Sequence, residues 1–231
     1  MATLSAPRGA RICPRMNLAR ARDAMVESQV RPSDVTDPAL VGAMRTLPRE
    51  RFAPAHLKPL AYADLELEVA PGRFLLRPRD IGKLIQALAP KAGTKALEIG
   101  GATGYGAALL AACGAAATTL DLDPELSFAA GAALQGAGIV GVEAVSGPLA
   151  AGWPAKAPYD SILVNGAVEM VPAAWIEQLA PGGRLGVVVR DGRAGRARLY
   201  TRTGEASAYR EIFDTMPPVL PGLAAARGFA F

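Results

Sequence analysis

The stretch "ALEIGGATGYG", residues 96–106, decides the fold class of this chain. Small and apolar residues lead through one acid, Glu98, into a turn rich in glycine. A buried strand that runs through a glycine turn into a helix presents backbone N–H groups to a nucleotide. The stretch therefore predicts a nucleotide-binding unit, and the question is which nucleotide it binds.

Strand and helix patterns alternate on both sides of this turn. We expect strands at residues 95–99, 117–122, 142–145, 161–164 and 184–189. We expect helices at residues 81–88, 104–112 and 124–137, and a further helix that ends at 175–179. A late antiparallel hairpin is expected from residues 198–201 and 208–213. Such alternation predicts an α/β fold with a doubly wound, mostly parallel, seven-stranded sheet that ends in this C-terminal hairpin.

The chain before this unit divides into two parts. Residues 1–15 carry arginines and prolines without apolar periodicity, which predicts a disordered extension. Residues 16–80 are expected to form helices at 17–30 and 38–47, then a loop-rich stretch with one strand at 65–69. Asp37 before a proline favours the start of the second helix. Residues 81–231 are expected to bind the nucleotide.

Composition limits the function classes. With 231 residues, 51% hydrophobic and 20% charged, the chain is expected to be one globular domain, or one with an appendage. The net charge of +4 comes without a basic run interleaved with aromatics, so nucleic-acid binding is not favoured. A single histidine, His56, and two cysteines argue against a metal site. Since neither a secretory signal nor a membrane-length apolar run is found, we expect a cytoplasmic protein without a membrane partner.

A second acid identifies the nucleotide more closely. Asp121 ends the next strand 21 residues after Gly100, about the spacing at which a carboxylate meets ribose hydroxyls. NAD favours G-x-G-x-x-G, whereas residues 100–104 read GGATG, closer to the G-x-G-x-G of adenosylmethionine enzymes, with Ala102 for the middle glycine. Glu98, just before the glycines, also favours a cofactor with a cationic end. We therefore favour S-adenosyl-L-methionine over NAD.

At this point the chain resembles the protein-L-isoaspartate O-methyltransferase family over residues 16–220. The matching pieces are "MVESQV" (25–30), "LVGAMRTLPRERFAP" (40–54), "AYADLELEV" (61–69), "ALEIGGATGYGAALLA" (96–111), "LDLDPEL" (120–126), "GWPAKAPYDSILVNGA" (152–167) and "QLAPGGRL" (178–185). Many methyltransferases share the glycine motif, but PRERFAP and AYxD are more specific to this family.

The resemblance implies a Rossmann-like, class I adenosylmethionine-dependent methyltransferase that repairs damaged protein by methylating a carboxylate. It implies that residues 16–80 shape the site for a protein or peptide acceptor. It also implies these cofactor-binding residues: Glu98, Gly100, Gly101, Thr103, Gly104, Asp121, Leu122 and Gly147. Where the family has a Gly-Asp pair that contacts the adenine, this chain has Gly147 followed by Pro148, so that acid is lost.

The larger departure is "GRFLLRP", residues 72–78, where the family pattern is similar to G-Q-T-I-S-Q-P. Aligned on the terminal glycine and proline, Leu76 takes the position of the family serine, whose hydroxyl lies at the transfer site. Phe74 replaces the threonine, and Arg77 replaces the second glutamine. Leu76 cannot donate a hydrogen bond and is expected to be non-functional. Arg77 either clamps a carboxylate or is a solvated loop residue.

Two functions therefore remain in view. The first is methyl transfer to an isoaspartyl carboxylate. The alternative is a family member that binds the cofactor but has lost this activity, and acts as a binding or regulatory protein or on another acceptor. A nucleic-acid methyltransferase is disfavoured because "VNGAVEMVP" stands after the fourth strand, where an N-P-P-Y-type motif would be expected. Asn165 in this stretch is expected to be a strand-end cap.

Overall fold

The computed structural model describes residues 17–204 and 206–225, and a seven-stranded sheet forms its centre. The strands follow the spatial order β5-β4-β3-β6-β7-β8-β9. Their bounds are β3 Lys95–Ile99, β4 Ala116–Asp121, β5 Val142–Ser146, β6 Tyr159–Val168, β7 Leu179–Asp191, β8 Ala194–Thr203 and β9 Ala206–Asp214. Strands β3 to β7 are parallel, and β8 and β9 are antiparallel. The prediction of a mostly parallel sheet that ends in an antiparallel hairpin is confirmed.

Helices cover both faces of the sheet. They are α3 Pro78–Leu88, α4 Tyr105–Ala112, α5 Pro124–Gly136 and α6 Ala173–Glu177, with short turns at η5 Leu149–Ala151 and η6 Pro154–Lys156. Within β3, Ala96 belongs to the apolar layer that contains α3 and α4, whereas Leu97 and Ile99 belong to the layer that contains α6. Successive strand residues point to opposite faces, so a strand with four buried residues in a row must be covered on both sides.

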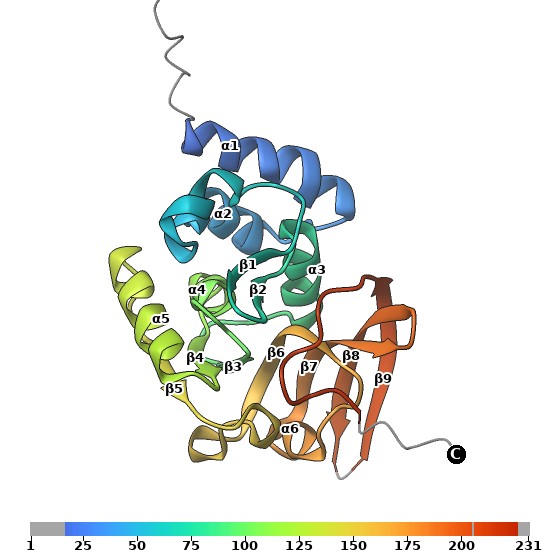
Figure 1. The fold of residues 1–231 in the computed structure, drawn as a ribbon. Coiled ribbons are helices and arrows are strands. Elements are labelled where there is room, and N and C mark those ends of the chain that lie inside the picture. Colours follow the sequence, from blue (N-terminus) through green and yellow to red (C-terminus); the bar gives the residue numbers. More distant parts are fainter. Residues whose placement is uncertain (1–16, 205, 226–231) are drawn as a thin grey trace, which may run out of the picture.

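The N-terminal segment packs beside α3 and α4 at one end of the molecule (Figure 1). It comprises α1 Leu18–Met25, η1 Val26–Val30, η2 Arg31–Ser33, α2 Pro38–Thr46, η3 Arg49–Phe52 and η4 Ala55–Leu60. The Asp37 side chain accepts a hydrogen bond from the backbone N–H of Leu40 (2.9 Å), which confirms the predicted helix start.

The predicted continuous helix at 17–30 is wrong in one respect. After Met25 the chain forms a wider π-helical turn, in which both Val26 and Val30 are fully buried. The two valines are four residues apart and both belong to the hydrophobic core. The expectation about residues 1–15 lies outside the described residues.

A two-stranded sheet, β1 Leu67–Ala70 with β2 Arg73–Leu75, lies apart from the main sheet. Its turn contains Gly72, whose φ of +67° favours glycine. The sequence predicted a strand near β1 but not β2. Side-chain and backbone contacts connect this hairpin to the carboxyl ends of the main strands, and those contacts define the candidate site.

Candidate functional site at the carboxyl ends of the strands

The candidate crevice is the region beyond the carboxyl ends of β3, β4 and β6, where the direction of strand connection changes. Strand β3 lies between β4, which follows it in the chain, and β6, which follows only after β5. In open α/β sheets, ligands bind beyond the carboxyl ends of the strands at this switch point. Here the glycine turn at residues 100–104 occupies that place, with both Gly100 and Gly101 donating backbone hydrogen bonds to Leu120 of β4.

The backbone of the glycine turn is tightly wound. Gly100 (φ +70°) and Gly104 (φ +85°) have left-handed conformations, which glycine adopts at little cost. Ala102, which stands for the middle glycine of the motif, is also left-handed at φ +50°. Thr103 Oγ1 donates to the Phe52 carbonyl (2.6 Å), so this side chain ties the turn to the N-terminal segment.

Glu98 lies beneath the turn and is fully buried. Its Oε2 accepts hydrogen bonds from Ala107 N (3.0 Å), at the start of α4, and from Thr119 Oγ1 (2.9 Å). Burial raises the pKa of this carboxyl to about 7, although these hydrogen bonds oppose the shift. A Cβ on Gly106 would lie 2.2 Å from Glu98 Oε1, so the acid needs glycine above it. The observed contacts of Glu98 support the turn from inside the protein.

Asp121 ends β4 at the crevice and is 2% exposed. Its Oδ2 accepts from Ala102 N (3.1 Å) and its Oδ1 accepts from Asp123 N (3.2 Å). The Nε of Arg73, itself 4% exposed, donates to both oxygens at 3.0 and 3.1 Å. Sequence analysis did not single out Arg73. Its position in "GRFLLRP", where the family pattern has its first glutamine, was the available signal.

The side chain of Asn165 joins the hairpin to the glycine turn. Its Nδ2 donates to the carbonyls of Phe74 (3.0 Å) and Gly100 (3.2 Å). Asn165 lies within β6 rather than at its end, so the prediction of a strand-end cap is wrong. It serves instead as a bridge between two loops, a role that depends on tertiary contacts and that the sequence did not indicate.

In the loop of residues 72–78, Leu76 is buried at 1% exposure, and its carbonyl accepts a hydrogen bond from Arg49 Nη2 (2.7 Å). Arg49 is also buried. Its Nε donates to the Ala61 carbonyl (2.7 Å), and its guanidinium lies 4.7 Å from the ring centre of Tyr105. Burial lowers the pKa of Arg49. Arg49, from the PRERFAP motif, therefore fixes the backbone of the loop that contains Leu76, a role that sequence analysis missed.

The remaining predicted residues lie around this crevice. Arg77 forms an ion pair with Glu66 (Nε to Oε1, 2.9 Å), so its cation already has a partner. Gly147 donates its backbone N–H to the Asp121 carbonyl (3.0 Å), which places the start of this loop beside β4. Leu122 is 49% exposed next to Asp121 and offers an apolar surface.

A C-terminal segment, residues 216–225, lies against the glycine turn and the tip of the β1–β2 hairpin. It is attached to β6 by hydrogen bonds between Ala167 and both Pro218 and Leu220 (2.9 and 2.8 Å). The side chain of Leu220 would be 2.9 Å from a Cβ on Gly100, and Pro221 lies against Gly72. This segment therefore contacts both the glycine turn and the hairpin.

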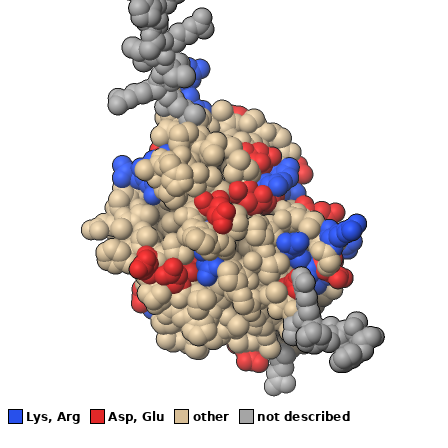
Figure 2. Space-filling view, viewed as in Figure 1, with Lys and Arg blue, Asp and Glu red and all other residues tan. Residues whose placement is uncertain are grey.

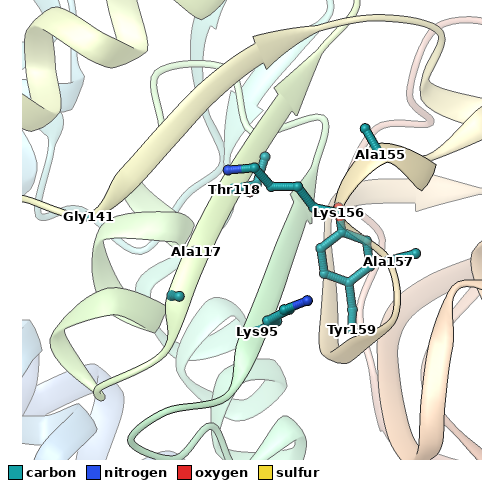
Figure 3. Close-up of a pocket in the computed structure, with 9 residues that line it drawn as sticks. Lys95, Ala117, Thr118, Gly141, Ala155, Lys156, Ala157 and Tyr159 are labelled. Atoms are coloured by element: carbon teal, nitrogen blue, oxygen red, sulfur yellow. The ribbon is translucent and has the colours of Figure 1, made fainter.

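The hollow shown in Figure 3 is a different place. It measures about 410 Å³ and is lined by residues near the amino-terminal starts of the strands, among them Lys95 of β3 and Tyr159 of β6, and by Lys156 of η6. Lys156 is ion-paired with Glu143. Since the glycine turn lies at the carboxyl ends of the same strands, this hollow is not the nucleotide crevice.

Three further observations concern partners. On the face in Figure 2, the described acidic and basic side chains are interspersed and form no extended cationic surface. Among residues 17–204 and 206–225, no helix is long and apolar enough to cross a membrane. In the same part of the chain, no group of three or more His, Cys, Asp or Glu side chains is arranged to hold a metal ion.

The sheet order, the glycine turn and an acid at the end of β4 define a class I, Rossmann-like methyltransferase fold. Comparisons with known proteins identify the family. The model of "Protein-L-isoaspartate(D-aspartate) O-methyltransferase" matches residues 20–216, and the chain belongs to this family.

Similar proteins support this assignment. A protein-L-isoaspartate O-methyltransferase of Methylorubrum populi is 38% identical over 89% of this chain and 98% of its own length. One from Rhodopseudomonas palustris is 38% identical over 81% of this chain and 77% of its own. A solved structure described as a Plasmodium falciparum protein-L-isoaspartate O-methyltransferase, in complex with S-adenosyl-L-homocysteine, has a TM-score of 0.73 at 15% identity. It covers 86% of this chain and 97% of its own, and it supports the fold.

Proposed function

We propose that this protein transfers the methyl group of S-adenosyl-L-methionine to a carboxylate of a damaged protein or peptide, that of an isoaspartyl residue, and that it does so in the cytoplasm. Membership of the family supports the reaction. The observation that carries the proposal is the position of Asp121, a buried carboxylate at the carboxyl end of β4 beside a glycine turn. A carboxylate in this place accepts hydrogen bonds from the two hydroxyls of a ribose.

The residues of the crevice fit this cofactor. The left-handed glycine turn lets a ligand approach the backbone closely, and Asp121 supplies acceptors for the ribose. The apolar surface of Leu122 suits an adenine, with Gly147 beside it. When bound, the cofactor supplies an electrophilic methyl group on a sulfonium. Glu98 contributes from beneath, by holding the turn and the start of α4 in place.

The acceptor needs little chemical assistance from the chain. Its carboxylate is ionised at neutral pH and requires no general base. Transfer forms a bond between a carboxylate oxygen and the methyl carbon and breaks the carbon–sulfur bond. The protein therefore acts by positioning the acceptor and excluding water. Leu76 is buried and offers no donor for orientation, so we expect transfer that is weaker than in relatives with a serine at this position.

Methyl transfer from labelled adenosylmethionine tests the proposal, with two peptides of the same sequence that contain either isoaspartate or aspartate. We expect slow formation of a base-labile methyl ester on the isoaspartyl peptide alone. We also expect binding of adenosylmethionine, measured by calorimetry. Binding without transfer to either peptide would instead support a binding or regulatory role, or another acceptor. If neither binding nor transfer occurs, the proposed function is wrong.

A further inference from the structure

Both oxygens of the Asp121 carboxylate, which we expect to bind the ribose, already accept hydrogen bonds from the protein itself. A carboxylate has about four lone-pair positions, two on each oxygen. Arg73 Nε and Asp123 N donate to Oδ1, and Arg73 Nε and Ala102 N donate to Oδ2. These four hydrogen bonds come from three N–H groups, because the single Nε–H of Arg73 is shared between both oxygens, and the other two donors are backbone groups of the fold. A ribose with two hydroxyls can therefore bind Asp121 only by displacing Arg73.

Arg73 has little else to hold it in this position. Among the described residues, the guanidinium of Arg73 makes one hydrogen bond besides those to Asp121, from Nη1 to the carbonyl of its neighbour Gly72 (3.3 Å). Both members of the ion pair are almost completely buried. A buried guanidinium without a counterion is costly, so release of Asp121 requires the guanidinium to move toward solvent.

Such a movement would take place at the tip of the β1–β2 hairpin. Arg73 is the first residue of β2, directly after the left-handed Gly72, and the pairing of β1 with β2 is irregular between Glu68 and Ala70. The base of β2 is held more firmly, by Asn165 on the Phe74 carbonyl and by Arg49 on the Leu76 carbonyl. At the tip, Gly72 N donates to Glu68 Oε1 within the hairpin itself (3.1 Å), and Pro221 contacts Gly72 by packing.

We propose that Arg73 is an internal competitor for the ribose-binding carboxylate. The cofactor then binds the population in which the hairpin tip has released Asp121. This inference rests on the proposed function. A ligand that binds only one of two conformations has its apparent affinity reduced by the fraction of that conformation. Removal of the competing cation therefore strengthens cofactor binding, although it removes a contact of the folded protein.

Calorimetry with S-adenosyl-L-homocysteine tests this inference on the full chain. We expect Arg73→Gln to bind about tenfold or more tightly than the wild type, as it would if the released form makes up about a tenth of the wild type. The matched control is Arg196→Gln, which removes an arginine from an exposed ion pair with Glu211 and is expected to leave the affinity unchanged. Equal or weaker binding by Arg73→Gln overturns the inference while the proposed function stands. Failure of both wild type and variant to bind overturns the proposed function and the inference with it.

A measurement on the wild-type protein covers the case in which Arg73→Gln does not fold. The Arg73 side-chain Nε–H resonance, assigned through its loss in Arg73→Lys, reports the pair directly by nuclear magnetic resonance. We expect saturation with S-adenosyl-L-homocysteine to shift this resonance and to speed its exchange with water, because the guanidinium leaves the buried carboxylate. An unchanged resonance at saturation shows that Arg73 keeps Asp121 in the complex, and the inference is then wrong.

Discussion

The glycine turn with the start of α4, where we expect the cofactor, and the loop of residues 72–78, where we expect the acceptor, are held in place in different ways. At the start of α4 the packing is tight, since Glu98 leaves no room for a Cβ at Gly106. In the loop of residues 72–78, Arg49 donates a hydrogen bond to the backbone carbonyl of Leu76. Every residue type has a backbone carbonyl, so this contact does not depend on the side chain. The comparison teaches that the start of α4 above Glu98 tolerates few residue types, whereas residues 74–77 can change while the loop keeps its place.

The largest effect is expected on the cofactor side, from a single methyl group. In Gly106→Ala the new Cβ would lie 2.2 Å from Glu98 Oε1 and 2.8 Å from Leu163 Cδ2. We expect a loss of about 3 kcal/mol in the free energy of unfolding, measured with urea. Gly42→Ala is the matched control, because its helical site has no atom within 4 Å of the new Cβ, and it should stabilise the protein by about 0.5–1 kcal/mol. Equal effects of the two substitutions would contradict the close fit between Gly106 and Glu98.

The pH dependence of stability tests Glu98 itself. Burial raises its pKa from the ordinary value of 4.5 to about 7, so the folded protein keeps a proton that the unfolded chain loses. The resulting stability is fully present below pH 4.5 and is lost as the pH rises through about 7. Relative to Glu98→Gln, the wild type should lose about 3 kcal/mol of unfolding free energy over this range. Urea unfolding at intervals of one pH unit measures the difference, and a flat difference would mean that the carboxyl is not shifted.

Asp121→Ala sharpens the comparison at the cofactor. This substitution removes the acceptors for the ribose, and we expect binding of adenosylmethionine to weaken by about 1–3 kcal/mol in calorimetry. Asp160→Ala serves as the control, because Asp160 accepts from Lys95 N at the opposite ends of the strands. Unchanged affinity in Asp121→Ala would show that Asp121 does not hold the ribose.

The acceptor side is tested by restoration of the family residues. The triple variant Leu76→Ser, Phe74→Thr and Arg77→Gln should raise turnover on an isoaspartyl peptide by about tenfold, equivalent to about 1.4 kcal/mol. Cofactor affinity should stay nearly the same, since the three substitutions leave Arg73 and the backbone carbonyls of residues 74 and 76, which Asn165 and Arg49 bind, in place. If wild-type turnover already equals that of serine-bearing relatives, then either the serine hydroxyl is not important for turnover or the alignment of residues 72–78 is wrong. A silent triple variant would turn attention to another acceptor or a binding role.

Most of the fold could be predicted because its signals are local. The apolar run of β3, the glycine turn and the Asp37 cap each lie within a few residues of sequence. The bounds were less accurate for β6 and β7, which begin earlier than predicted at Tyr159 and Leu179. Their extra residues pair with each other, and such pairing depends on a partner strand that the local pattern does not show.

The candidate site could be predicted only in part, for the same reason. The glycine motif and its spacing from Asp121 indicated the crevice, because both follow from strand length. The partner of Asp121 is Arg73, 48 residues earlier in the chain, and the acceptor loop is held by Arg49, 27 residues before Leu76. Contacts across such separations are set by the packing of the hairpin against the sheet. A single sequence carries no direct signal for them.

The antiparallel end of the sheet has a consequence for how the molecule behaves among its own copies. Within the described residues, no strand pairs with the outer side of β9, so its backbone N–H and C=O groups form an open edge. Such an edge invites pairing with another chain unless charges discourage it. Arg210, Glu211 and Asp214 lie along β9, and all three are exposed. A strand that approached β9 would have to strip water from these charges, and the protein is thereby protected against growth into a shared, continuous sheet.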